Sequence, residues 1–225
     1  MNRTPLLLFA LAFVAIASGA AWYLVDSRND AFGVPAPMAT STPQVDESLA
    51  IYTNGPYGFS VFYPEAAAVE YAFDETYHLP SFWRANALPE GAGMPIVAFI
   101  PYAISREDSY PRYFTAMVRI GASSDPSEIE RCESSASDQG ETQLPDATIN
   151  GAVWKAFSFQ SAGMMQYASG VSYRRIHEEK CIALEKIRTG SSYREEPASD
   201  DIADSVLDAE YEKLSEIVES VTFAR

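Results

Sequence analysis

The stretch Gly58-Phe59-Ser60-Val61-Phe62-Tyr63-Pro64 alternates large and small side chains and ends at a proline, and this pattern predicts a β-strand. A continuous apolar run, Ile96-Val97-Ala98-Phe99-Ile100, predicts a second strand at the centre of a sheet. Asn150-Gly151 is a hairpin signal, and the returning strand is expected at 153–159. Further strands are expected at 69–73, 114–121, 165–173 and 181–189.

Two helices are expected beside these strands. Asp125 can cap a short helix that extends to about Cys132, with Pro126 in its first turn. Apolar residues at spacings of four and three predict a carboxyl-terminal helix whose apolar face covers the sheet: Ala203, Leu207, Tyr211, Leu214, Val218 and Val221. The fold class is therefore α+β, an antiparallel sheet flanked by helices.

Three acidic residues lie at the start of the carboxyl-terminal helix: Asp200, Asp201 and Asp204. They either complement the helix dipole on a solvated face or bind a cation, and the first interpretation is the simpler one.

Charge and cysteine content restrict the partners and the compartment. The 225 residues carry 31 acidic and 16 basic side chains, a formal net charge of −15. Such a chain repels nucleic acid and anionic lipid headgroups, so neither is expected as a partner. Its two cysteines, Cys132 and Cys181, are expected to form a disulfide in an oxidising exterior, and the alternative is two separate buried thiols.

Residues 1–25 form an apolar leader whose core, Pro5 to Leu24, contains no charge and is long enough to span a bilayer as a helix. We expect a signal anchor that places the carboxyl-terminal domain outside the cytoplasmic membrane in a single pass. The alternative is a signal peptide cleaved near Ala20, which would release the protein. Residues 26–49 are rich in Pro, Ala, Ser and Thr and predict a linker, and residues 50–225 form the extracytoplasmic α+β domain.

No stretch of the sequence carries a recognisable catalytic or cofactor motif. The two histidines, His78 and His177, lack the ligand spacing of a zinc site, and no nucleophile elbow, phosphate loop or dinucleotide fingerprint is present. We therefore expect no enzyme activity, no cofactor, no metal site and no catalytic residues.

An aromatic segment, Tyr71 to Trp83, lies at the start of a long irregular connection at 74–95. Four of its side chains could line a ligand or partner surface: Tyr77, His78, Phe82 and Trp83. The alternative is that these rings close one end of the core.

Tyr57-Gly58-Phe59-Ser60-Val61-Phe62-Tyr63-Pro64 resembles the opening strand of PsbP-like domains, and Ile217 to Phe223 resembles their final helix and the strand that follows it. Tyr173 to Cys181 is similar to a segment of small exported bacterial proteins of this type. The resemblance implies a PsbP-like α/β/α sandwich with an accessory or assembly role and no enzyme activity. It transfers no ligand residue to this sequence.

These observations rank three functions. The first is a non-enzymatic, membrane-tethered domain with an accessory or interaction role, whose partner is another envelope protein. The second is a module that binds a small ligand or peptide through the aromatic segment at 71–83. The third is an envelope hydrolase. The sequence alone leaves the oligomeric state open.

Overall fold

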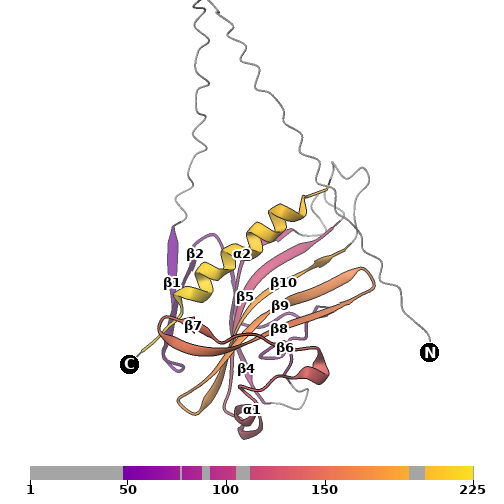
Figure 1. Ribbon diagram of the computed structural model, residues 1–225. Coiled ribbons are helices and arrows are strands. Elements are labelled where there is room, and N and C mark those ends of the chain that lie inside the picture. The colour runs from indigo at the N-terminus through magenta and orange to yellow at the C-terminus, as the bar shows by residue number, and fades with distance from the viewer. Residues whose placement is uncertain (1–47, 77, 88–91, 105–111, 193–200, 225) are drawn as a thin grey trace, which may run out of the picture. The chain divides into compact units, whose positions relative to one another are not determined.

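The computed structural model describes residues 48–76, 78–87, 92–104, 112–192 and 201–224 (Figure 1). The expected leader, most of the expected linker, and Tyr77 lie outside these residues. Within the described ranges, no helix is both long and apolar enough to cross a membrane.

A large antiparallel sheet forms the centre of the domain. Its strands run in the order β3-β4-β5-β10-β9-β8-β6, and β7 also pairs with β8. The strands are β3 (Ala68–Glu70), β4 (Met94–Ile104), β5 (Phe114–Ser123), β6 (Thr142–Gln143), β7 (Ala147–Ile149), β8 (Ala152–Gly163), β9 (Gln166–His177) and β10 (Lys180–Ser191). Every pairing joins strands that run in opposite directions, and β8, β9 and β10 form two successive hairpins.

One face of this sheet is covered by helix α2 (Asp204–Ser220) and by a small second sheet (Figure 1). The small sheet has the order β1-β2-β11, with β1 at Leu49–Asn54, β2 at Phe59–Pro64 and β11 at Thr222–Phe223. Helix α2 packs on β5, β10 and β2. Its buried residues, among them Leu207 and Leu214, join the largest apolar cluster of the domain.

The opposite face is covered by irregular chain and one short helix. Residues 79–87 lie on it, together with the five-residue helix α1 (Pro126–Glu130) and the 3-10 turn η1 (Ser137–Gln139). The chain approaches β5 so closely that a side chain at Gly121 would collide with the Trp83 carbonyl group. Helices therefore flank the sheet less evenly than an α/β/α sandwich implies: α2 has 17 residues, whereas the helical segments described on the second face are α1, with five residues, and the short turn η1.

Most of the expected elements are present. The short helix begins after Asp125, which caps it, and the Asn150-Gly151 turn joins β7 to β8 with both residues at positive φ. Every expected strand is found, although the one expected at 69–73 is limited to β3. Strand β1 was not expected, and it begins at the last residue of the segment assigned to the linker.

Candidate functional site

Three of the aromatic-segment residues singled out from the sequence, His78, Phe82 and Trp83, are described, and they do not share one surface. Trp83 is buried, with 2% of its surface exposed, and packs with Ala87, Ala183 and the two cysteines. Phe82 is partly exposed, whereas His78 lies at the edge of a separate hollow. Trp83 therefore closes the core, which was the alternative interpretation of this segment.

His78 is held by the end of β8. Its Nε2 atom lies 3.0 Å from the Gly163 carbonyl oxygen, and its Nδ1 atom lies 3.0 Å from the Ser161 hydroxyl. Because a carbonyl oxygen only accepts, Nε2 donates to the Gly163 carbonyl group, and Nδ1 shares a hydrogen bond with the Ser161 hydroxyl. The hollow beside it has a volume of about 320 Å³ and is also lined by Asn86 and Gln160.

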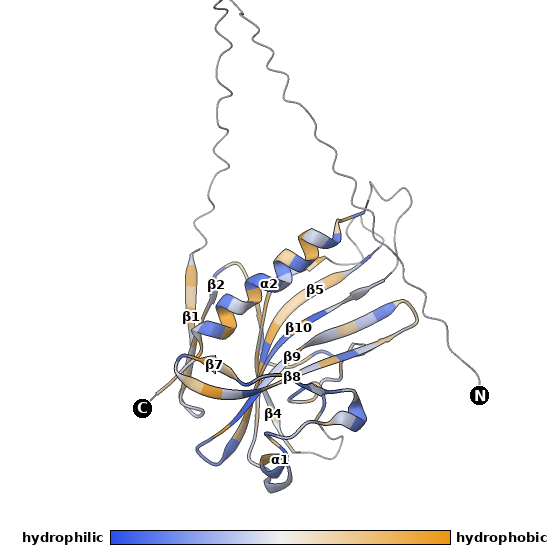
Figure 2. Ribbon diagram, in the orientation of Figure 1, coloured by the Kyte–Doolittle hydropathy of each residue, from blue (hydrophilic) through white to orange (hydrophobic). Residues whose placement is uncertain are grey.

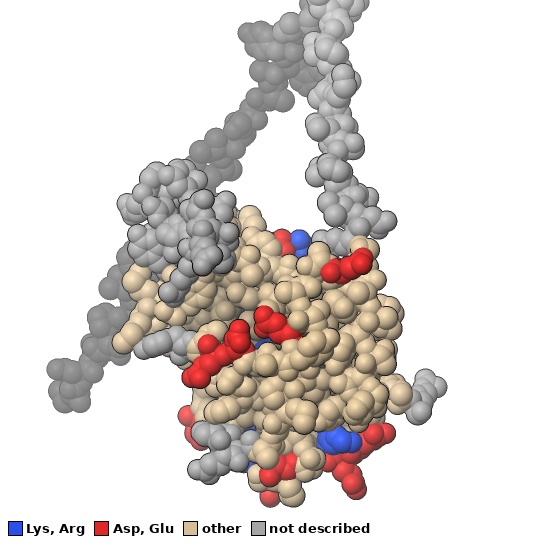
Figure 3. All heavy atoms as spheres, turned by 180° about the vertical axis from the view of Figure 1, so that it is seen from behind, with Lys and Arg blue, Asp and Glu red and all other residues tan. Residues whose placement is uncertain are grey.

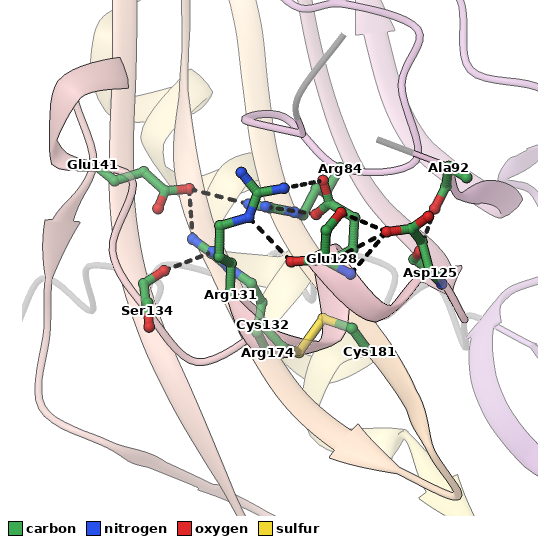
Figure 4. Close-up of a disulfide and its surroundings, with 12 residues drawn as sticks. Arg84, Ala92, Asp125, Glu128, Arg131, Cys132, Ser134, Glu141, Arg174 and Cys181 are labelled. Atoms are coloured by element: carbon green, nitrogen blue, oxygen red, sulfur yellow. Dashed lines mark hydrogen bonds and ion pairs between the residues drawn. A yellow bond between two sulfur atoms is a disulfide. The ribbon is translucent and has the colours of Figure 1, made fainter. Parts of the chain in front are cut away.

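Buried ion pairs fasten the covering segment to the sheet (Figure 4). Arg84 lies 2.9 Å from Glu128 and 4.0 Å from Glu141, and Arg174 lies 2.5 Å from the same Glu141 carboxylate. All four side chains are almost inaccessible to solvent. Burial lowers the pKa of Arg174, and the Glu141 carboxylate opposes that effect.

A second buried ion pair joins β5 to β10. Arg119 lies 3.0 Å from Glu185, whose carboxylate also accepts the Ala85 N–H, and the Arg119 guanidinium stacks on the Phe73 ring. These carboxylates are fully committed to arginines and backbone groups. Their arrangement explains how an irregular segment is held on a sheet face.

The expected disulfide is present. Cys132, just after α1, is bonded to Cys181 at the start of β10, and both residues are fully buried (Figure 4). The bridge ties α1 to the sheet beside the Arg84–Glu128 pair. Its role is therefore structural, and it agrees with the oxidising exterior expected from the sequence.

The acidic start of α2 is neutralised by an arginine. Arg112 lies 3.0 Å from both Asp201 and Asp204, while Asp200 lies outside the described residues. This pairing favours the structural interpretation of these acids over a cation site. In the described part of the chain, no group of three His, Cys, Asp or Glu residues is placed to hold a metal ion.

A larger hollow lies between the end of β2 and the last turns of α2, and we call it the α2 groove. Its volume is about 530 Å³. The apolar part of its lining includes Leu49, Phe62, Tyr63, Pro64, Ala67, Pro101 and Ile217. Four charged residues complete the lining: Glu65, Glu210, Lys213 and Glu216. The groove is therefore an apolar trough with a predominantly acidic border.

The outer surface of the small sheet continues this trough, and we call it the β1–β2 face: Leu49, Ile51, Phe62 and Pro64. Ile51 is paired with Phe62 and Leu49 with Pro64, so their side chains lie on the same side of the two strands. Leu49 is 63% exposed, Ile51 58% and Phe62 47%. Figure 2 shows the start of β1 as hydrophobic at the margin of the molecule.

Charge is unevenly distributed over the rest of the surface. The view from behind Figure 1 shows a mostly uncharged face with Asp and Glu gathered near its middle and its lower end, and little Lys or Arg (Figure 3). Several basic side chains, including Arg84, Arg119 and Arg174, are buried in ion pairs. The excess of acidic residues is therefore concentrated at the surface, where it affects the choice of partner.

Comparison with known proteins gives likenesses of structure only. No family model and no curated protein matches the sequence. The solution structure of cyanobacterial PsbP (CyanoP) from Synechocystis sp. PCC 6803 matches with a TM-score of 0.40 and 11% identity, over 84% of this chain and 100% of that one. The crystal structure of LpqN, a protein involved in cell envelope biogenesis of Mycobacterium tuberculosis, matches with a TM-score of 0.29 and 10% identity, over 81% of this chain and 88% of that one.

Proposed function

We propose that this chain is a non-enzymatic, membrane-tethered extracytoplasmic domain that binds another envelope protein through the β1–β2 face and the α2 groove. The observation that carries the proposal is the exposed apolar surface of Leu49, Ile51 and Phe62, which is continuous with the α2 groove. Contiguous exposed apolar residues bordered by polar ones are typical of interaction sites. The apolar leader and the buried disulfide support a location outside the cytoplasm.

The face of the large sheet under residues 79–87 and the β1–β2 face of the small sheet differ in what they offer a partner. The face under residues 79–87 is filled by Trp83 and by paired arginines and carboxylates, so it offers little surface to a partner. The β1–β2 face presents large apolar side chains directly to solvent. An apolar centre with a charged border is the arrangement found in protein–protein interfaces.

Co-purification from intact cells tests the proposal. A tagged full-length copy is crosslinked in parallel with the double variant Leu49→Lys/Ile51→Lys and the matched control Val153→Lys/Val206→Lys, which alters exposed residues on β8 and α2. A partner is expected with the parent and the control and should be lost with the β1 variant. Equal recovery with both variants would contradict the assignment, and turnover of an envelope substrate would contradict a non-enzymatic role.

A second candidate is the binding of a small polar ligand in the hollow beside His78. It is favoured by the polar groups that meet there, including the Asn86 side-chain amide nitrogen, which is buried without a hydrogen-bond partner. A ligand carbonyl or hydroxyl could accept a hydrogen bond from it. Screening small polar compounds for thermal stabilisation of the parent, but not of Asn86→Ala, would support this function, and equal stabilisation of both would refute it.

A further inference from the structure

We propose that the edge of β1 binds its partner by strand addition: an extended segment with alternating apolar residues and basic flanks pairs antiparallel with Leu49–Asn54. The inference rests on the proposed function and specifies the chemistry of the partner. Strand β1 is the outermost strand of the small sheet, and within the described residues no strand lies beyond it (Figure 1).

The register of β1 shows which backbone groups are open. The Glu65 N–H donates to the Ser48 carbonyl at 2.9 Å, so these two residues form a hydrogen-bonded pair. Pair types alternate along antiparallel strands, so the even-numbered residues of β1 bond to β2. The odd-numbered residues, Leu49, Ile51 and Thr53, turn their N–H and C=O groups to the open edge. The same three residues carry the exposed side chains.

Strand β1 lacks the devices that usually protect an edge. Its sequence, Leu49-Ala50-Ile51-Tyr52-Thr53-Asn54, contains no charge and no proline. The far side of β2 is occupied, because β11 pairs with the start of β2 and the Ser220 hydroxyl lies within 3.0 Å of both backbone groups of Phe62. Strand β1 therefore provides an open edge that adjoins the apolar face.

The charges that line the α2 groove indicate which kind of partner segment would bind beside it. The α2 groove has three carboxylates, on Glu65, Glu210 and Glu216, and one ammonium group, on Lys213, which already lies 2.8 Å from Glu210. A segment with Lys or Arg beside its apolar residues would complement this border. A second copy of this chain, with a net charge of −15, would be repelled. The partner segment is therefore an apolar, basic-flanked strand from another protein.

The pairing geometry makes a specific demand on that segment. Residues directly opposite Leu49, Ile51 and Thr53 would exchange hydrogen bonds with them, and their side chains would lie over the apolar β1–β2 face. In a peptide of alternating valine and threonine, the valines would take these positions. A methyl group on each valine nitrogen would then block pairing, whereas methyl groups on the threonine nitrogens would face away from β1.

Fluorescence anisotropy with the full-length chain in detergent micelles tests this inference. The probes are four labelled octapeptides of alternating valine and threonine. Two of them differ in the residue at both ends, which is lysine in one and glutamate in the other. The other two have lysine at both ends and carry N-methyl groups either on the valines or on the threonines. We expect the lysine-flanked probe to bind at least tenfold more tightly than the glutamate-flanked probe. N-methylvaline should cost at least tenfold in Kd, and N-methylthreonine should leave it within twofold.

Three results would overturn the inference: no binding of the lysine-flanked probe at millimolar concentration, equal effects of the two N-methylated probes, or dimerisation of the chain that Leu49→Lys/Ile51→Lys abolishes. The proposed function fails separately, through the co-purification experiment. If a partner is lost with Leu49→Lys/Ile51→Lys while both N-methylated probes bind with the same Kd, the proposed docking on the apolar face is supported and strand addition is refuted.

Discussion

Replacing Cys132 and Cys181 together by alanine should destabilise the domain substantially while preserving its fold. The bridge joins residues separated by 49 positions, and it closes β6 to β9 into one loop. In the chain-entropy model, a loop of this length contributes about 4 kcal/mol to the free energy of unfolding. For a domain of this size each kcal/mol corresponds to about 2–4 °C in Tm, so the expected decrease is about 8–16 °C.

Thermal melting followed by far-ultraviolet circular dichroism measures this difference. Because the bridge is fully buried, the parent is reduced in denaturant and refolded with reductant before its melting curve is compared with that of the Cys132→Ala/Cys181→Ala variant. The reduced parent should melt close to the variant, and reductant should not change the variant further. Identical melting of the oxidised parent, the reduced parent and the variant would refute the structural role of the bridge.

Two further predictions concern buried charge and helix capping. Glu141→Ala leaves the buried guanidinium of Arg174 without its carboxylate, so it should lower the free energy of unfolding, measured in urea, by about 3–5 kcal/mol. The control Lys155→Ala removes an exposed ion pair and should hardly change the urea concentration at the unfolding midpoint. Equal midpoints for the two variants would show that the buried ion pairs of Glu141 do not stabilise the domain. Hydrogen bonds from Ser127 and Glu128 lower the pKa of Asp125 in the folded protein. The Asp125 carboxylate therefore stabilises the fold fully above the ordinary aspartate pKa of about 3.9, and this stabilisation is lost as the pH falls through the lower pKa of the folded state. The difference in unfolding midpoint between Asp125→Ala and the parent should therefore shrink from pH 7 to pH 2, and a constant difference would show that the carboxylate charge is irrelevant.

Local sequence patterns were sufficient for much of the fold. The spacing of Leu207, Leu214 and Val218 reports one buried helix face, and that face is buried in the structure. The Asn150-Gly151 turn and the Asp125 cap were equally predictable, because each depends on a few neighbouring residues. The disulfide followed from cysteine number and the expected compartment.

Features that depend on distant contacts were not predictable in this way. Trp83 lies in an irregular segment without periodicity, and its burial depends on distant contacts with Gly121, Ala183 and the disulfide. The ion pairs of Glu141 with Arg84 and Arg174 join residues far apart in the chain, and no local pattern reports them. A sequence contains many carboxylates, and burial alone distinguishes these.

The β1–β2 face was missed for a different reason. Strand β1 begins at the last residue of the segment assigned to the linker, so its short sequence, Leu49–Asn54, was not recognised as a strand. The exposed positions carry Leu49 and Ile51, which in a sequence are indistinguishable from core residues. Only the pairing of β1 with β2 shows that these side chains face outward.

Site-specific photo-crosslinking in intact cells tests whether the β1–β2 face contacts an envelope protein. A photoreactive benzoyl-phenylalanine is placed at Ile51, in the β1–β2 face, or at Val153, which is exposed to a similar extent on β8. We expect a discrete crosslinked envelope protein from position 51 and none from position 153. The same product from both positions, or no product from position 51 while the tagged parent still co-purifies with a partner, would contradict it.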